Sequence, residues 1–561
     1  MEKVVTMVKN VERNNQISNL IADQIYVDNN IERDEVLSAL EILLNGNYKK
    51  YVFDIQIKKP FKNNLQNDLA LSKFNEKTPI RKEKGVYYTP QDLTNYIDLN
   101  AMLTAILDNN NKTYKDYKAI ETILEMDDSI VRDLIFNKTF FDPTCGSGEF
   151  LITTAELKIK FLKSKFSITD ENILKIAQTI YGNDISEESA DVAMFRLFNC
   201  LSKFIVDHKR YTDLGTTIKS NFSTYDFVNY KNQIKKSFDI ILGNPPYIEY
   251  GKYSGERNNH LKYGNVYADV VHNTINLIKP NGALGFVLPL SYVATNRMSN
   301  LREEVIENFN TQFVLSFADR PDCLFAGVHQ KLCILIAKKG REEHRLFTSK
   351  YNIWRKDERN KLLNGCEIIR VFNGTATYIP KIGNSLEESI FRKVRTVSLN
   401  NIFDSRSKSG DKIYLNMRAA FWIKAFSFNP GSKEYKELTF PLEKKNFILA
   451  VLNSSLYWMF WTIVSDGWHI TSKELKEFLV PDKNIDYQKF DKLVSKLEEK
   501  LEKTKKYICT KQTEYEYKHK ECKSIIDKID DALAEIYALT PEELTYVKKF
   551  YQSYRIGEKN D

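Results

Sequence analysis

The chain is 561 residues long, which exceeds one ordinary domain and predicts two to four of them. Hydrophobic residues make up 42% and charged residues 28%, which excludes an intrinsically disordered protein. The formal net charge of +8 is compatible with a polyanionic partner but does not require one, because a lysine-rich surface gives the same surplus.

The cysteine pattern and the hydropathy indicate the cellular compartment in which the protein works. The cysteines are scattered, odd in number and form no CxxC pair, at positions 145, 200, 323, 333, 366, 509 and 522. This pattern predicts reduced thiols in a cytoplasmic protein, with neither a disulfide framework nor a metal site. The first residues hold no apolar signal core and no long apolar run follows, so we expect no membrane span.

The chain divides into four parts by residue composition and by the spacing of its apolar residues. Residues 1–80 are polar, with helical spacing of apolar residues around 21–44, and predict a small helical lead-in. Residues 81–340 alternate short apolar runs with helical stretches, which predicts a Rossmann-like α/β domain with a mostly parallel sheet. Its last two runs, at 311–318 and 331–339, are close enough to form an antiparallel hairpin at the edge of that sheet.

Beyond residue 340 the pattern is less regular. Residues 341–482 are mixed, aromatic and basic, and the dense aromatic run at 457–464 is typical of a core. Residues 483–561 are rich in lysine and glutamate and keep leucine or isoleucine at helical spacing. They predict a pair of long helices or a coiled-coil hairpin with a structural or oligomer-contact role.

A glycine turn follows the first strand of the α/β domain, in FFDPTCGSGEF (140–150). Asp142 opens the turn, and Gly146 and Gly148 let the backbone pass close to a ligand. A helix predicted from Glu149 presents free amides that suit an anionic group. The spacing is neither that of the dinucleotide fingerprint nor that of a phosphate loop. A tight turn without a ligand is the alternative interpretation.

A second strand ends in IYGNDIS (180–186) with Asp184. An acidic residue at that place can accept hydrogen bonds from both hydroxyls of a ribose. A solvated aspartate explains the residue equally well when it is taken alone. After the glycine turn, however, the pattern favours a ligand that contains a nucleoside.

A third strand ends in FDIILGNPPY (238–247). Asn244 offers a side-chain oxygen, Pro245 keeps its carbonyl but has no amide donor, Pro246 stiffens the loop, and Tyr247 offers a flat ring. Two acceptors beside an aromatic ring suit a planar base with an exocyclic amine. They would return electron density to that nitrogen as it attacks, so catalysis is positioning and preorganised dipoles without a general base. A proline-rich turn capped by asparagine is the alternative.

Taken in order, DPTCGSGEF, YGNDIS and GNPPY resemble the S-adenosylmethionine-dependent adenine-specific DNA methyltransferases, in the motif order of the gamma class. The upstream segment KGVYYTPQDLTNYI (84–97) is similar to the first cofactor motif of that family. The resemblance is close over 84–340 and looser over 410–548, where it is to long restriction–modification methylases.

The resemblance implies roles for individual residues. Asn244, Pro245, Pro246 and Tyr247 would hold and stack a flipped adenine, with His329 or Phe325 on its other face and His329 favoured. The cofactor S-adenosylmethionine would contact residues from five segments: Tyr88, Thr89, Pro90, Asp142, Thr144, Gly146, Gly148, Asp184, Asn221, Phe222 and Asn244. Asn221 stands where the family often has an aspartate, and its alignment is open.

The resemblance also implies a partner and leaves alternatives. The substrate would be double-stranded DNA, read by residues 341–482, with residues 248–265 as a closing or ordinary surface loop. A cognate restriction endonuclease could act on a separate chain; FDIQIKK (53–59) has Gln56 where a nuclease needs an acid. A methylating subunit that needs a specificity partner, a binding module without activity, and an enzyme acting on RNA or on a protein amide remain open, as does a monomer or a homodimer.

Overall fold

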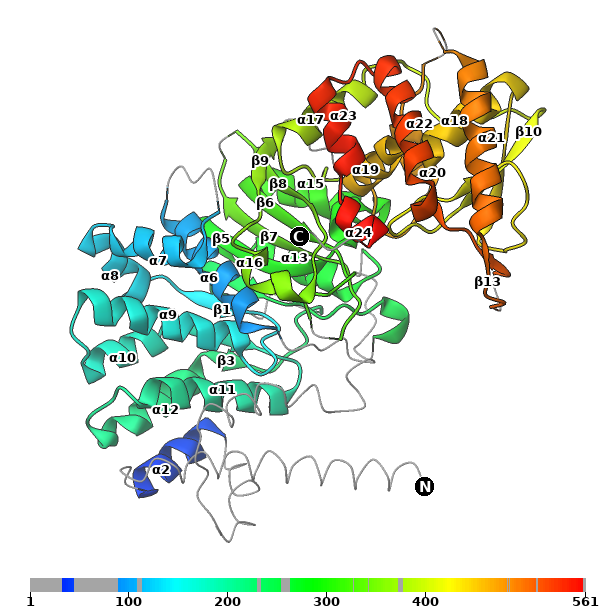
Figure 1. The fold of residues 1–561 in the computed structure, drawn as a ribbon. Coiled ribbons are helices and arrows are strands. Elements are labelled where there is room, and N and C mark those ends of the chain that lie inside the picture. Colours follow the sequence, from blue (N-terminus) through cyan, green and yellow to red (C-terminus); the bar gives the residue numbers. More distant parts are fainter. Residues whose placement is uncertain are drawn as a thin grey trace, which may run out of the picture.

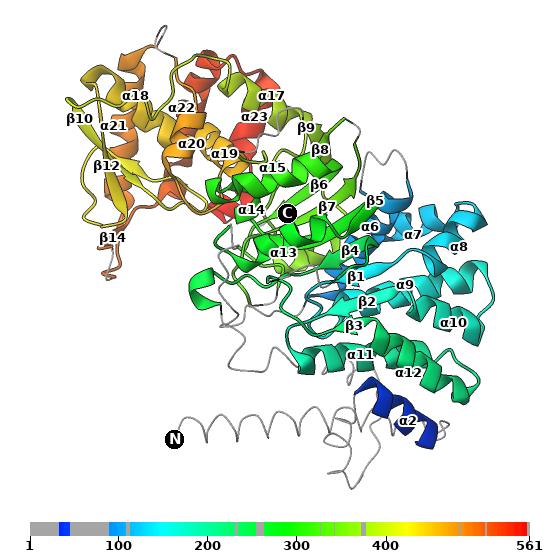
Figure 2. The same ribbon diagram turned by 180° about the vertical axis from the view of Figure 1, so that it is seen from behind.

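The computed structural model of the chain describes residues 33–44, 89–107, 113–229, 234–253, 263–325, 327–341, 343–371, 377–481, 483, 485–510 and 513–557. The largest sheet within these residues has the strand order β3-β2-β1-β4-β5-β7-β6-β8-β9 (Figures 1 and 2). In chain order the strands are β1 (Phe140–Asp142), β2 (Ile180–Asn183), β3 (Phe222–Ser223), β4 (Phe238–Gly243), β5 (Ile278–Pro289), β6 (Phe309–Phe317), β7 (Leu332–Lys339), β8 (Arg345–Asn352) and β9 (Ile368–Val371).

The first half of this sheet is parallel. Strands β3, β2, β1, β4 and β5 pair in parallel from one neighbour to the next. Strand β4 is buried at every position, as expected of a central parallel strand that is covered on both faces. The structure therefore confirms the predicted α/β fold with a mostly parallel sheet.

Helices cover both faces of the sheet. Phe140 and Phe141 are neighbours in β1 and belong to two different hydrophobic cores, because successive side chains of a strand point to opposite faces. One core holds α6 (Gln91–Ile106), α7 (Asp116–Leu124), α8 (Asp128–Phe136), α9 (Glu149–Lys165), α10 (Asp170–Ala177), α11 (Glu187–Ser202) and α12 (Tyr211–Ser220). The other holds α13 (Val266–Ile275) and α15 (Ser299–Asn308).

Little of the expected N-terminal lead-in falls within the described residues. Helix α2 (Arg33–Leu43) packs on α12, where a Cβ added to Gly215 would lie 3.0 Å from the carbonyl oxygen of Ala39. The remainder of residues 1–80, including the segment 53–59, lies outside the described residues.

The second half of the sheet differs from the expectation in one respect. Strands β6 and β7 are antiparallel as predicted, but β7 lies between β5 and β6 and the pair is not at the edge. The free side of β6 is covered by β8 in parallel, and β9 follows in antiparallel pairing. The sheet therefore continues past residue 340, where the catalytic domain was expected to end, to Val371.

The C-terminal region is a helical unit with a small sheet at its outer side (yellow to red in Figure 1). The small sheet contains β10 (Asp411–Asn416), β11 (Ala425–Phe426) and β12 (Tyr435–Phe440). The helices are α17 (Ser385–Val394), α18 (Leu442–Asn453), α19 (Ser455–Val464), α20 (Ser472–Glu477), α21 (Tyr487–Thr504), α22 (Lys523–Ile536), α23 (Pro541–Lys549) and α24 (Gln552–Ile556). Helix α19 carries the aromatic run and is buried at every position, which confirms that the run is core.

The two lysine-rich helices do not form a separate coiled coil. Helix α21 buries Phe490 against Phe447 of α18, with ring centroids 5.1 Å apart, and its Val494 belongs to the same core. The expected regions 341–482 and 483–561 thus share one hydrophobic core. The short strands β13 (Lys506–Tyr507) and β14 (Tyr515–Glu516) lie between α21 and α22 in the chain. They project from the rest of the C-terminal region (Figure 1).

The last described residues, around α24, return to the large sheet. The hydroxyl of Tyr551 donates to the carbonyl of Tyr351 at the end of β8 (2.7 Å), and Arg355 donates to the carbonyl of Ser553 (3.0 Å). Among the described helices none is by itself long and apolar enough to cross a membrane. Helices α18 and α19 reach that length and hydropathy jointly, but they are bent by 67° where they meet.

Candidate active site

The predicted motifs meet because their strands are adjacent. Strands β2, β1 and β4 run parallel, so the segments after their carboxyl ends lie at one edge of the sheet. The glycine turn after β1 has Gly146 at φ +54° and Gly148 at φ +89°, a conformation that favours glycine. Helix α9 begins directly after Gly148, at the residue that the sequence predicts.

Two glycines allow the close packing of this edge. A Cβ on Gly148 would lie 3.0 Å from the Cβ of Ala193 in α11. A Cβ on Gly243, the last residue of β4, would lie 2.9 Å from Oδ1 of Asp142. The structure therefore places Asp142 directly against the strand that delivers Asn244.

Buried carboxyl groups give this edge its electrostatic character. Burial raises the pKa of Asp142 well above its usual value, the Thr144 amide opposes the rise, and the charge of Asp184 adds to it. Burial likewise raises the pKa of Asp98 in α6, where Thr154 donates to one carboxyl oxygen and Asp142 adds repulsion. A cationic ligand would stabilise the charged forms of these groups.

Two buried polar atoms at this edge have no hydrogen-bond partner among the described residues. They are Oδ1 of Asp98 and the hydroxyl oxygen of Thr144, which lies between Asp142 and Gly146 in the glycine turn. Buried polar atoms are nearly always satisfied, and a polar ligand in the turn would supply partners for these two. The methionine part of S-adenosylmethionine, with its ammonium and carboxylate groups, fits that requirement.

Asp184 joins the glycine turn after β1 to the turn after β2. Its Oδ2 accepts from the Gly146 amide (2.8 Å) and its Oδ1 accepts from the Ser186 amide (2.9 Å). These two contacts fix the orientation of the carboxylate. The side chain is half-buried at the mouth of the turn.

Two supporting residues were missed by the sequence analysis. Asn183 is buried, and its side-chain amide donates to the carbonyls of Pro143 (2.9 Å) and Tyr225 (3.0 Å), which ties together the turns after β1 and β3. Arg196 of α11 donates to the carbonyl of Ser147 (2.6 Å) and to Glu149 (2.5 Å). The sequence did offer a sign of Arg196, because it is a single charged residue within the apolar stretch 192–198.

The Asn-Pro-Pro-Tyr loop after β4 is held by hydrogen bonds at both ends of the asparagine amide. Nδ2 of Asn244 donates to the Thr89 hydroxyl (3.1 Å), and its Oδ1 accepts from the Tyr247 hydroxyl (2.6 Å). That hydroxyl also lies 3.1 Å from the carbonyl oxygen of Val287 in β5. Pro245 is buried and Pro246 half-buried, so the loop is anchored against the sheet.

The segment before α6 also contacts the loop after β4. Tyr88 lies outside the described residues, whereas Thr89 is buried beside Asn244 and Pro90 is the residue that precedes the first turn of α6. Asp92 in that first turn accepts two hydrogen bonds from Arg359 in α16 (Arg359–Leu362), at 2.6 and 2.9 Å. The described part of the upstream motif is thus fixed in position next to the Asn-Pro-Pro-Tyr loop.

The structure does not bring Asn221 to this cluster. Its side-chain amide donates to the carbonyls of Ala177 (3.0 Å) and Ile180 (3.1 Å) near the beginning of β2, because β3 starts only after Asn221. Phe222 covers Gly182, where an added Cβ would lie 2.5 Å from the ring. Asp226, which follows the end of β3, is the acidic residue at the expected edge.

The two candidates for the second stacking ring differ in exposure. Phe325 is buried in the core, whereas His329 is exposed and its Nδ1 lies 3.1 Å from the carbonyl oxygen of Asp319. His329 precedes β7, whose first residue Leu332 pairs with Pro289 at the end of β5. His329 is therefore at the same edge as the loop after β4, and of the two it is the ring that a ligand could reach.

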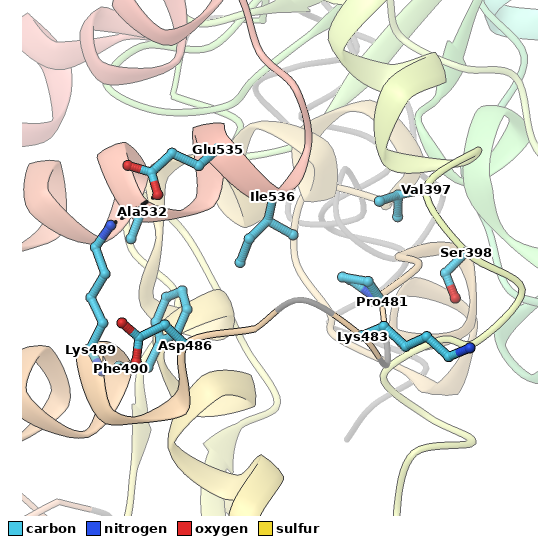
Figure 3. A pocket seen from close by; sticks show the side chains of 10 residues that line it. All are labelled: Val397, Ser398, Pro481, Lys483, Asp486, Lys489, Phe490, Ala532, Glu535 and Ile536. Carbon is cyan, nitrogen blue, oxygen red and sulfur yellow. Dashed lines mark hydrogen bonds and ion pairs between the residues drawn. The ribbon is translucent and has the colours of Figure 1, made fainter.

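A cavity of about 580 Å³ lies elsewhere, in the C-terminal region (Figure 3). Its apolar wall includes Pro481, Phe490 and Ile536, and its rim carries the ion pair of Lys489 with Glu535 (3.1 Å). None of the residues that line it belongs to the predicted site. Within the described parts of the chain, no group of three or more His, Cys, Asp or Glu side chains could hold a metal ion.

Comparisons with known proteins agree with this geometry. Residues 178–323, from β2 to the segment before β7, match the family described as Eco57I restriction-modification methylase. The chain is 22% identical over 372 residues to the Type II restriction enzyme and methyltransferase RM.Eco57I of Escherichia coli, across 56% of this chain and 36% of that protein. It is 25% identical over 178 residues to the Type II methyltransferase M.VspI of Vibrio sp. (strain 343), across 30% of this chain and 36% of that protein.

A solved structure extends the likeness over the whole fold. The Type IIL restriction-modification enzyme MmeI, solved in complex with DNA, aligns with a TM-score of 0.52 and 12% identity, across 98% of both chains. This likeness concerns the fold. The matched region spans about a third of the length of the two curated relatives described above.

Proposed function

We propose that this protein is a DNA methyltransferase that transfers a methyl group from S-adenosylmethionine to the 6-amino group of an adenine swung out of duplex DNA. The observation that carries the proposal is the position of Asn244. Its amide lies at the end of β4, hydrogen-bonded to Thr89 and Tyr247, on the sheet edge that also carries Asp142 and Asp184. The match of residues 178–323 to restriction–modification methylases supports it, because that match spans the loop.

Catalysis in this account rests on two oxygen acceptors. An exocyclic amine is a weak nucleophile because the ring withdraws its lone pair. The side-chain oxygen of Asn244 and the carbonyl of Pro245 would each accept one amine hydrogen and so return electron density to the nitrogen. The rigid Pro-Pro pair would hold the Pro245 carbonyl in place before the substrate arrives, so the contribution of this oxygen requires no reorganisation during the reaction. The proton becomes acidic only after attack and needs no base beforehand.

The cofactor would occupy the edge between the glycine turn and the loop after β4. When bound, S-adenosylmethionine supplies an electrophilic methyl group on a positively charged sulfur. The Thr144 hydroxyl and the Asp142 carboxyl would hold its methionine part, and Asp184 would accept hydrogen bonds from its ribose. Asp226 is better placed than Asn221 to meet the amine of its adenine, since Asp226 follows β3 at the same edge.

Tyr247 would stack on the target base. In the structure its hydroxyl donates to Asn244, so the acceptor that the amine needs is engaged until the base enters. The hydroxyl can turn instead to the carbonyl of Val287, 3.1 Å away, and this exchange frees Asn244 without leaving an unpaired donor. Base–aromatic stacking is worth about 1–3 kcal/mol, which would offset part of the few kcal/mol that base flipping costs.

Recognition of the DNA sequence would fall to the C-terminal region. Its turn 465–469 packs on the catalytic sheet edge: Lys331, next to the His329 loop, lies over the ring of Trp468 (4.6 Å), and a Cβ on Gly467 would meet the Tyr351 hydroxyl at 2.5 Å. His469 in that turn is exposed and paired with Asp466 (2.7 Å). This turn would therefore stand beside the flipped base, with His469 directed toward DNA.

The experiment that tests the proposal is product analysis. The chain is incubated with isotope-labelled S-adenosylmethionine and unmethylated duplex DNA of mixed sequence, and the digested nucleosides are separated by mass spectrometry. Label in 6-methyladenine supports the proposal, whereas label in 4-methylcytosine moves it to another base. Transfer to RNA or to protein under matched conditions would replace it with the alternative substrates.

A second arrangement has an observation in its favour. The Escherichia coli relative is described as both a restriction enzyme and a methyltransferase. The present chain could therefore be the methylating part of a system that also needs a nuclease or specificity partner. Binding of S-adenosylmethionine with no transfer to DNA, restored by adding the partner, would establish that arrangement.

A further inference from the structure

The amide of Asn244 is contacted at one end by a residue distant in sequence and at the other by its own loop. Its Nδ2 donates to the hydroxyl of Thr89, a residue 155 positions earlier, at 3.1 Å. Its Oδ1 accepts from the Tyr247 hydroxyl at 2.6 Å. Thr89 is 3% exposed, so its hydroxyl meets the amide in a buried environment.

The orientation of this amide decides whether the proposed reaction can occur. An asparagine side chain presents either an acceptor oxygen or a donor nitrogen, and a target amine can use only the oxygen. When the oxygen faces the target, the NH₂ group points the opposite way. A buried NH₂ group that lacks an acceptor is destabilised, and the amide would then favour the rotated, unproductive orientation.

Thr89 supplies that acceptor from a rigid position. It directly precedes Pro90 and the first turn of α6. That helix packs tightly on the sheet, where a Cβ on Gly285 of β5 would lie 2.8 Å from Ile97. The ion pair of Asp92 with Arg359 (2.6 Å) holds its start. The hydroxyl therefore stays in place when Tyr247 moves to the Val287 carbonyl.

We propose that Thr89 is a positioning residue, which keeps the Asn244 amide oxygen directed at the target amine by accepting a hydrogen bond from the amide nitrogen. This inference rests on the proposed function and deepens it. It assigns Thr89 a role through Asn244, in place of the contact with the cofactor methionine that the family resemblance implies. The Tyr247 hydroxyl holds the same orientation until the base displaces it.

The test compares Thr89→Val with Thr89→Ser. Valine has nearly the shape of threonine without the hydroxyl, and serine keeps the hydroxyl. We expect Thr89→Val to lower the single-turnover rate of methyl transfer about 10- to 100-fold. Thr89→Ser should stay within about threefold of the wild type, and calorimetric affinity for S-adenosylmethionine should stay within about threefold in both variants. An equal loss of cofactor affinity and rate in Thr89→Val, or a full rate, would overturn the proposal.

A second readout does not depend on the substrate. With ¹⁵N-asparagine, the Asn244 side-chain NH₂ signal is assigned by its absence in Asn244→Ala. Its hydrogen exchange should be slow in the wild type and in Thr89→Ser, and at least about tenfold faster in Thr89→Val. Unchanged exchange in Thr89→Val contradicts the positioning role even if the methyl acceptor is not DNA. A wild type that methylates no DNA but shows the exchange difference refutes the proposed function alone.

Discussion

The amide of Gly146 donates a hydrogen bond of 2.8 Å to the carboxylate of Asp184, which lies 38 residues further along the chain. One carboxylate therefore both fixes the glycine turn after β1 and faces the place proposed for the ribose. The charge of Asp184 also raises the pKa of the buried Asp142 carboxyl. The turns after β1 and β2 are therefore coupled, and a change at Asp184 should affect both.

Replacing Asp184 should weaken cofactor binding. Asp184→Ala removes the acceptor for the ribose and for the Gly146 amide, so we expect affinity for S-adenosylmethionine to fall at least about tenfold. Asp184→Asn keeps one oxygen acceptor, so its affinity for S-adenosylmethionine should lie between those of the wild type and Asp184→Ala. Isothermal titration measures the change, and an alanine variant with wild-type affinity would remove Asp184 from the cofactor site.

The two glycines of the turn should differ in their tolerance of a side chain. Gly148→Ala adds a methyl group 3.0 Å from the Ala193 Cβ at φ +89°, whereas a Cβ on Gly146 meets no atom within 4 Å. Gly146→Ala should lower the unfolding free energy by about 1–2 kcal/mol, because alanine is strained in the left-handed backbone conformation. Gly148→Ala should lower it further, because the added methyl group also meets Ala193. Denaturant unfolding without cofactor compares them. Equal losses would show that contact with Ala193 is unimportant.

Much of the fold and part of the site could be predicted from the sequence. Apolar runs that end in Asp142, Asp184 and Asn244 were sufficient to place three parallel strands, since such strands are largely buried. The glycine turn and the beginning of α9 followed from local backbone chemistry. These features depend on short segments, which is why sequence reasoning found them.

Contacts between distant segments were harder to predict. β8 extends the sheet past residue 340 because β6 has a free side, which depends on β7 lying between β5 and β6. Strand β3 has only two residues, and Asn221 precedes it whereas Asp226 follows it, so the sequence left the alignment of Asn221 open. The bonds of Asn183 and Arg196 to the turns join residues about 40 to 50 positions apart, and no periodicity signals them.

Phe325 and His329 should give opposite results when each is replaced by alanine. Phe325→Ala empties a buried site and should lower the unfolding free energy by about 3–5 kcal/mol. His329→Ala should leave stability nearly unchanged and slow methyl transfer, because the exposed ring is the proposed partner of the base. His329→Phe is the matched control that keeps a ring. A His329→Ala variant with the wild-type rate would exclude stacking by His329.

Lys381 should make stability depend on pH. It is buried, and its Nζ donates to the carbonyls of Ile463 (2.9 Å) and Ser465 (2.6 Å) in the C-terminal region. Burial, aided by the charge of Lys473, lowers the pKa of Lys381 to about 7. An unfolded lysine titrates near 10.4, so between about pH 7 and 10 the unfolded state binds more protons, and stability from this group rises with pH.

The measurement compares the wild type with Lys381→Met. The difference in unfolding free energy between them should increase with pH from 7 to 9 by up to about 1.4 kcal/mol per pH unit. Below pH 7 the folded lysine is protonated as well, so the difference should level off. Parallel pH curves for the two proteins would show that Lys381 titrates normally in the folded state.

The most direct test of the account is methyl transfer to DNA adenine by the wild type and by Asn244→Ala, with cofactor affinity measured on both. The account predicts labelled 6-methyladenine with the wild type, a loss of at least about 100-fold in the variant, and S-adenosylmethionine affinity that falls far less. An Asn244→Ala variant that methylates adenine at the wild-type rate would contradict it, because no other residue in the loop supplies the side-chain acceptor.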